Sequence, residues 1–165
     1  MKLTHIDESG RARMVDISSK PTAARMARAQ GCLFIKKRTA ERIREAGLPK
    51  GNPFEVARIA GIQAAKKTAA LIPLCHSINL DFVDVKIDLR EDRFLVESTV
   101  RCRWATGVEM EALTAVTVAA LTLYDMCKAV DSEMSLGEIR LLEKRKDFHP
   151  NEGDQRGIAP SASNE

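Results

Sequence analysis

An acidic and a basic side chain stand three residues apart near the end of the longest apolar stretch of the chain. Asp125 and Lys128 follow the mostly apolar residues 112–124. On a helix this spacing puts both on one face, where a surface ion pair contributes little to stability. If the pair is partly buried, Lys128 has a lowered pKa and exchanges protons near neutral pH, with Asp125 as its acid–base partner. The sequence leaves both interpretations open.

Two carboxylates stand at the other end of the same apolar stretch. Glu109 and Glu111, separated by Met110, follow Gly107. Negative side chains in the first turn of a helix are stabilised by the partial positive charge of its N-terminus, which explains them without any function. Alternatively, one carboxylate accepts two hydrogen bonds from the guanidine-like edge of a ligand. The residue types alone do not separate these interpretations.

A cysteine and a histidine follow closely after a proline in the middle of the chain. Cys75 and His76 come after Pro73 and Leu74. The histidine is either structural or a proton or hydrogen-bond donor at the mouth of a site. Adjacent side chains diverge, so we do not expect this pair to bind a metal. The four cysteines show no C-x-x-C spacing, and we predict free thiols and no metal site.

Lys50 differs from most cations of the chain because it stands immediately before a predicted helix start. Asn52 is a typical N-cap residue, and Pro53 fits the first position of a helix. Backbone N–H groups at a helix N-terminus, together with a lysine, can hold a phosphate. The signal is weaker than a P-loop because the glycine-rich loop is missing. Other cations are spread in the way that is usual for solvated surface: Arg25, Arg38, Arg42, Arg44, Arg58, Lys66 and Lys67.

The chain divides into an arm, a folded domain and a tail. We assign residues 1–148 to a single domain that begins with a polar arm at 1–20, and residues 149–165 to a mobile tail. The arm contains at most one short strand, at 14–17. Residues 22–36 alternate like a strand, but their Ala and Arg content also suits a helix. The stronger strand signal covers 31–36.

Capping residues and alternation define the other elements. Thr39 is the expected N-cap of a helix that stops at Gly47. The two runs that alternate apolar and polar residues are joined by a short link, which predicts an antiparallel hairpin. The expected elements are helices at 39–46 and from 53 to before Pro73, strands at 79–89 and 93–104, a helix at 109–130 and a strand at 134–144.

This order of elements predicts an α+β fold of the ferredoxin-like class. It is the split β-α-β pattern, with an antiparallel sheet and helices on one face. The helix at 109–130 is apolar on most sides, so we expect it to be buried nearly all round, with cover from a second subunit. Glu111 and Asp125 are fourteen positions apart, about 21 Å along one helix. A small substrate that needs both would therefore bind between two chains.

Composition and charge exclude several classes of protein. With 165 residues, 44% hydrophobic and 30% charged, the chain is typical of a globular domain. A net charge of +3 and an aromatic content of 4% do not favour nucleic-acid binding. The first residues lack an apolar signal core and the run at 112–124 is shorter than a membrane span, so we expect a cytoplasmic protein. The alternative, an RNA-binding module, would need exposed aromatics, whereas Phe94 and Trp104 fall on the apolar face.

Several long motifs resemble one known family. They are residues 3–7 (LTHID), 14–18 (MVDIS), 57–66 (ARIAGIQAAK), 72–76 (IPLCH), 106–115 (TGVEMEALTA) and 123–130 (LYDMCKAV). From about residue 3 to 148 the chain resembles the MoaC family of cyclic pyranopterin monophosphate synthases. The resemblance implies a lyase of molybdenum cofactor biosynthesis, which converts 3',8-cyclo-7,8-dihydroguanosine 5'-triphosphate to cyclic pyranopterin monophosphate and pyrophosphate. It implies no cofactor.

The resemblance also implies residue roles and an assembly. Asp125 and Lys128 match the family's active-site pair, with Lys128 as proton donor and acceptor. The matching substrate-binding positions are Leu74, Cys75, His76, Met110, Glu111, Glu109, Lys50, Lys66 and Arg25. Family members form homohexamers, trimers of dimers with sites between subunits, and work after a radical SAM enzyme that cyclises GTP. A homologue that binds the nucleotide without turnover is the remaining alternative.

Overall fold

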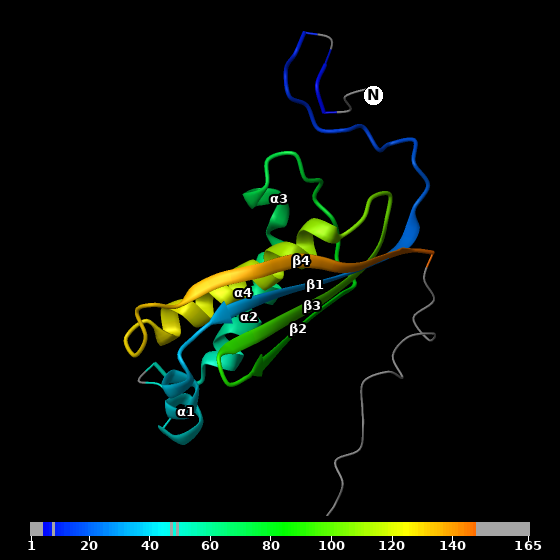
Figure 1. Cartoon of the computed structure of the whole chain (residues 1–165). Coiled ribbons are helices and arrows are strands. Elements are labelled where there is room, and N and C mark those ends of the chain that lie inside the picture. Colours follow the sequence, from blue (N-terminus) through cyan, green and yellow to red (C-terminus); the bar gives the residue numbers. More distant parts are fainter. Residues whose placement is uncertain (1–4, 8, 47, 49, 148–165) are drawn as a thin grey trace, which may run out of the picture.

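The computed structural model describes residues 5–7, 9–46, 48 and 50–147 (Figure 1). The elements in chain order are β1 (Ala23–Phe34), α1 (Lys37–Ala46), α2 (Pro53–Lys66), α3 (Thr68–Leu71), β2 (Phe82–Leu89), β3 (Arg93–Trp104), α4 (Glu109–Cys127) and β4 (Ser135–Lys146). The predicted tail at 149–165 and the predicted helix stop at Gly47 lie outside the described residues.

Four strands form one antiparallel sheet in the order β2-β3-β1-β4. Helices α2 and α4 pack together and cover one face of it (Figure 1). The predicted α+β class is therefore confirmed, and the strand order is compatible with the ferredoxin-like arrangement. The predicted hairpin is also present, because β2 and β3 pair from Phe82 opposite Arg101 to Leu89 opposite Phe94.

The ambiguous segment at 22–36 is a strand along most of its length. β1 pairs with β3 from Ala23 opposite Trp104 to Phe34 opposite Arg93, and it pairs with β4 on its other side. As a central strand it satisfies its backbone groups on both sides, which outweighs the helix propensity of its Ala and Arg residues. The strand signal at 31–36 therefore located only part of β1.

Asparagine capping of α2 is as predicted. The Asn52 side chain accepts hydrogen bonds from the N–H groups of Phe54 (2.9 Å) and Glu55 (3.4 Å). The helix ends at Lys66, and the separate turn α3 follows before Pro73. The helix predicted to run toward Pro73 is thus two helices.

Two predictions of local structure are wrong. α1 begins at Lys37, two residues before Thr39, so Thr39 lies inside the helix and is not its N-cap. The Thr39 hydroxyl bonds to Asp131 instead. Residues 14–17 of the arm do not form a strand. The arm instead contains an isolated β-bridge between Ile6 and Ala12. At Thr39, a hydrogen bond to a residue 92 positions away takes the hydroxyl that was expected to cap the helix.

Small residues let α2 and α4 approach each other closely. A Cβ on Gly61 would lie 2.9 Å from the carbonyl oxygen of Ala115 and 3.2 Å from the Cβ of Ala119. Backbone atoms cannot yield as easily as the end of a long side chain. The contact therefore fixes α4 against α2, and with it the position of both ends of α4.

α4 is the core helix of the fold. Ala112, Val116 and Leu123 on its inner side are fully buried, but Leu121 on its outer side is 55% exposed. The helix is therefore not buried all round in the single chain. It is the one helix in the described part of the chain that is long and apolar enough to cross a membrane, which corrects the expectation drawn from 112–124. Because 56% of that span is buried inside the fold, it has the character of a core helix.

The aromatic residues of the central strands do not form a stacking surface. Phe94 is fully buried, and Trp104 packs partly buried against the core. On the edge strand β2, the exposed ring of Phe82 is covered by the Arg101 guanidinium, 4.7 Å from its centre. RNA-binding modules of this architecture stack bases on exposed aromatics of their sheet. The described strands give that alternative no support.

Candidate active site

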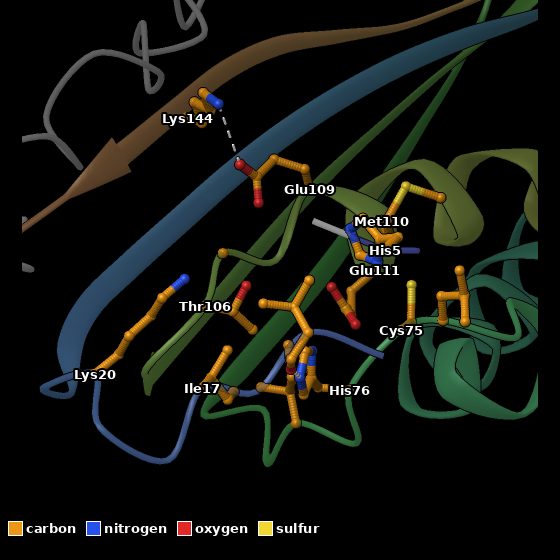
Figure 2. Close-up of a pocket in the computed structure, with 14 residues that line it drawn as sticks. His5, Ile17, Lys20, Cys75, His76, Thr106, Glu109, Met110, Glu111 and Lys144 are labelled. Atoms are coloured by element: carbon orange, nitrogen blue, oxygen red, sulfur yellow. Dashed lines mark hydrogen bonds and ion pairs between the residues drawn. The ribbon is translucent and has the colours of Figure 1, made fainter. Parts of the chain in front are cut away.

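A cavity of about 590 Å³ opens at the N-terminal end of α4 (Figure 2). The arm before β1, the segment between α3 and β2, and the turn between β3 and α4 meet there, and β4 contributes Lys144. Three segments that are far apart in the sequence thus enclose one space. Such a concave site with a few polar groups is the usual form of a small-molecule site.

Six of the predicted substrate-binding residues line this cavity: Leu74, Cys75, His76, Glu109, Met110 and Glu111. The segment after α3 supplies the first three, and the first turn of α4 supplies the others. Arg25, also predicted, lies in an adjoining cavity of about 200 Å³. The two cavities share the lining residues Gly107, Glu109 and Lys144. The fold therefore brings seven predicted residues to one end of α4.

Glu111 is the buried acid of this cavity, with only 4% of its surface exposed. Burial raises the pKa of Glu111, its own backbone N–H opposes this, and the charge of Glu109 raises the pKa further. Burial and then the charge of Glu111 also raise the pKa of the Cys75 thiol. A raised pKa disfavours the thiolate form of Cys75. Glu111 is suited to hold or share a proton with a ligand.

Glu109 connects the cavity with β4. Its carboxylate lies 3.4 Å from Nζ of Lys144 (Figure 2). It also folds back over Gly107, where a Cβ would stand 1.9 Å from Oε2 of Glu109. A side chain at position 107 would displace this carboxylate. Glycine there leaves room for Glu109 between the cavity and β4.

His76 ties the arm to the body of the domain. Its Nε2 donates a hydrogen bond to the carbonyl oxygen of Val15, 2.7 Å away. The arm then lines the cavity with His5, Ile17 and Lys20. The predicted donor at position 76 is thus engaged with the arm in the single chain.

Several lining residues were not predicted, including His5, Lys20, Thr106 and Lys144. His5 and Lys20 belong to a polar arm whose composition does not point to a site. Lys144 lies on an ordinary alternating strand, and only the fold places it beside Glu109. His5 and Thr106 did carry a signal, because they stand in the 3–7 and 106–115 motifs.

The predicted catalytic pair lies at the other end of α4. Nζ of Lys128 is 2.7 Å from Oδ1 of Asp125, and Nζ of Lys50 is 2.7 Å from Oδ2. Hydrogen bonds from Lys128 and then Lys50 lower the pKa of Asp125 to about 2. The hydrogen bond and charge of Asp125 raise the pKa of Lys128. The hypothesis that burial lowers the pKa of Lys128 is therefore wrong for the single chain, where its side chain is 56% exposed.

The length of α4 separates these two groups of residues. Glu111 and Asp125 are fourteen residues apart on one continuous helix, Glu109–Cys127, which corresponds to about 21 Å. Lys66, the remaining predicted residue, ends α2 and lines neither cavity. One chain thus holds the two groups of predicted residues at opposite ends of α4 and does not bring them together.

Comparisons with known proteins agree with the motifs. The family model described as MoaC family matches residues 14–147. A cyclic pyranopterin monophosphate synthase of Parvibaculum lavamentivorans is 57% identical over 145 residues, 87% of this chain and 91% of that protein. The protein of the same name from Magnetococcus marinus is 54% identical over 144 residues, 86% of this chain and 88% of its own length. A molybdenum cofactor biosynthesis bifunctional protein of Chlorobaculum tepidum is 49% identical over 156 residues, 91% of this chain and 50% of that protein. The chain belongs to the MoaC family.

Proposed function

We propose that this protein is a cyclic pyranopterin monophosphate synthase. It converts 3',8-cyclo-7,8-dihydroguanosine 5'-triphosphate to cyclic pyranopterin monophosphate and pyrophosphate, an early step of molybdenum cofactor biosynthesis. Family membership and relatives of that name support the proposal. The observation that carries it is the chemistry at the two ends of α4: a cavity with a buried acid at one end, and a carboxylate held by two lysines at the other.

The cavity at the start of α4 holds the guanine-derived ring of the substrate. That ring carries N–H groups on a guanidine-like edge, and the carboxyl groups of Glu109 and Glu111 accept such hydrogen bonds. Met110, which is 39% exposed, offers apolar surface to the ring. Nearby cations suit the phosphates: Lys144 lies beside Glu109, and Arg25 lines the adjoining cavity.

Asp125 and Lys128 are the proposed catalytic residues. With a pKa of about 2, Asp125 is ionised at neutral pH, and it keeps Lys128 protonated. Lys128 therefore acts first as an acid toward the substrate. In the phosphoryl step a substrate hydroxyl oxygen bonds to the α-phosphorus, the bond to pyrophosphate breaks, and the hydroxyl proton passes to a base. A Lys128 that gave up its proton in an earlier step is the base.

The complete site takes one half from each of two chains. A partner subunit brings its own catalytic pair to the cavity of this chain, and the burial that follows lowers the pKa of Lys128 relative to the single chain. Uncovered apolar side chains on the helical layer support such an assembly: Val56 is 45% exposed, and Ile59 and Leu121 are each 55% exposed. Three such dimers form the homohexamer that the family resemblance implies.

We place the enzyme in the cytoplasm, in a sequence of at least two reactions. The substrate is a cyclised nucleotide, so another enzyme must first cyclise GTP. We assign that step to a radical SAM enzyme. Neither a membrane nor a nucleic acid has a role in the proposed reaction. The partners are thus a small-molecule substrate and further copies of the same chain.

Conversion of the cyclised nucleotide tests this proposal. The purified protein is incubated with freshly prepared substrate, and the pyranopterin product and pyrophosphate are both quantified. We expect one pyrophosphate for each product molecule. Binding of the nucleotide without product would instead show a homologue that has lost turnover, and would contradict the proposal.

A further inference from the structure

A buried aspartate lies just beyond the catalytic end of α4. Asp131 is 4% exposed, and its carboxylate accepts hydrogen bonds from the N–H of Lys36 (3.0 Å), the hydroxyl of Thr39 (2.9 Å) and the N–H of Glu133 (3.1 Å). Burial alone would raise the pKa of Asp131, but the bonds from Lys36, Glu133 and Thr39 lower it, so the group is ionised at neutral pH. Thr39 is 2% exposed, so its bond to the carboxylate is shielded from water.

Asp131 is also joined to the last turn of α4. Its N–H donates to the carbonyl oxygen of Cys127 at 3.1 Å, and the N–H of Lys128 donates to that of Tyr124 at 2.9 Å. Asp131 therefore stands three residues beyond Lys128 in a turn that is bonded to the helix. Its carboxylate fixes the start of α1 to the segment that carries Lys128.

The far end of the segment that begins with α1 returns to α4. Lys50 precedes a turn at Gly51, where a φ of +92° favours glycine. From there Nζ of Lys50 reaches Oδ2 of Asp125 at 2.7 Å and its carbonyl oxygen at 3.0 Å. Two aspartates six positions apart thus bind the start of α1 and Lys50: Asp131 accepts from Lys36 and Thr39, and Asp125 accepts from Lys50.

Apolar contacts hold α1 on the core, and near its end the Arg44 guanidinium donates to the carbonyl oxygens of Leu89 (3.2 Å) and Arg90 (2.9 Å). Ala40 is fully buried and Ile43 is 6% exposed, and both belong to the main apolar cluster. Such contacts are non-directional, whereas the hydrogen bond from Thr39 to Asp131 has a defined length and angle. We infer that Asp131, acting through Thr39, is a positioning residue that sets Lys50 on Asp125. The inference rests on the proposed function, because it takes the cluster around Asp125 to be catalytic.

Removal of one hydroxyl tests the inference. Thr39→Val keeps the shape of the side chain and removes the donor, so we expect kcat to fall about tenfold to a hundredfold, as for other misplaced catalytic groups. Thr39→Ser keeps the donor and should restore kcat to near the wild-type value. The matched control is Thr68→Val, because Thr68 is equally buried, at 1%, and its hydroxyl bonds to the carbonyl oxygens of Ala64 and Ala65 at the end of α2. That variant should leave kcat unchanged.

A double-mutant cycle separates positioning from general stability. If Thr39 acts through Lys50, then Thr39→Val has no further effect on single-turnover rates in the Lys50→Ala background. If Thr39 has only a structural role, the same factor is lost in both backgrounds, which overturns the inference. Wild-type kcat in Thr39→Val overturns it as well.

A replacement variant covers a failure to fold, and wild-type activity separates failure of the proposed function from failure of the positioning role. Should Thr39→Val fail to fold, Asp131→Asn, which keeps one acceptor oxygen, replaces it in the same cycle with the same expected outcomes. If the wild-type protein does not convert the substrate at all, the proposed function fails. If the wild type turns over but the cycle is additive, the positioning role alone fails.

Discussion

Lys50 and Asp125 are in contact although they are 75 positions apart in the sequence. Nζ of Lys50 donates to Oδ2 of Asp125 at 2.7 Å and also to its backbone carbonyl oxygen at 3.0 Å, near the negative end of α4. Nζ of Lys128 lies 2.7 Å from the other carboxylate oxygen, Oδ1. Two ammonium groups on one carboxylate leave a net positive charge, which suits a substrate that carries phosphates.

Loss of either member of the proposed catalytic pair should abolish turnover and spare the fold. For Lys128→Ala and Asp125→Ala we expect kcat to fall by about 10² to 10⁴-fold or more, because a positioned proton-transfer group contributes that much. Both side chains are more than half exposed, so the melting temperature should change little. Glu55→Ala, from the similarly exposed Glu55–Arg58 ion pair, is the control. Activity above about a tenth of wild type in either variant would rule out the assignment.

Glu111→Gln should remove a pH dependence of stability. Burial raises the pKa of Glu111 above its usual 4.5, so the folded chain binds this proton more tightly than the unfolded chain. The resulting stability is fully present below the unfolded pKa and is lost as the pH rises through the folded pKa. A neutral Gln does not lose this stability. At pH values above the folded pKa of Glu111, the variant should therefore have a higher melting temperature than wild type.

Thermal unfolding by circular dichroism, from about pH 4 to about pH 8, measures this difference. The melting temperature of Glu111→Gln relative to wild type should rise with pH. Glu55→Gln, at an exposed position, should show no such trend. A difference for Glu111→Gln that stays constant across the range would contradict a raised pKa.

Local sequence patterns were sufficient to predict an element where each residue's environment depends on residues close to it in the chain. In β3, Phe94, Val96 and Val100 occupy even-numbered positions and are fully buried, while the polar Glu97, Thr99 and Arg101 occupy odd-numbered ones, so the pattern predicted both the strand and its inner face. The N-cap of α2 was predictable for the same reason, because Asn52 bonds to residues two and three positions away.

Long-range contacts were not predictable in this way. Thr39 has the residue type of an N-cap, but its partner Asp131 is 92 positions away. His76 was a candidate donor, but the sequence does not show that Val15 of the arm accepts its hydrogen bond. The association of Lys50 with Asp125 likewise depends on how α1 and α4 are placed in the fold. The motifs contain most of the predicted residues that line the cavity, while the separation of Asp125 and Lys128 from that cavity became visible only in the structure.

Gly61→Ala should destabilise the protein by about 1 to 3 kcal/mol, the usual effect of overpacking. The new Cβ would lie 2.9 Å from the carbonyl oxygen of Ala115, so α2 or α4 must shift. Gln63→Ala, exposed on the same helix, should change the stability by less than about 0.5 kcal/mol. Denaturant unfolding of both variants measures this. Equal stability of the two would mean that α2 and α4 have room to separate.

The exposed apolar residues of the helical layer should be buried in the assembly. Wild-type protein should show the mass of six chains by light scattering. Leu121→Glu places a charge at a side chain that is 55% exposed in the single chain, and should reduce both the mass and the activity. Leu142→Glu, at a position that is 38% exposed on β4, is a comparison on a different element. A monomer that remains fully active would refute an obligate assembly.

Complementation between two inactive variants tests the shared site most directly. An Asp125→Ala chain retains the cavity with His76 and Glu111, and a His76→Ala chain retains Asp125 and Lys128. Subunits are exchanged by co-expression or mild denaturation, and the exchange is verified by mass spectrometry. In a random mixture half of the two-fold interfaces are mixed, and each mixed interface has one intact site and one site with both defects. We therefore predict the return of about a quarter of wild-type activity. A verified mixture as inactive as either parent would contradict the account, because both partial sites would then belong to one chain.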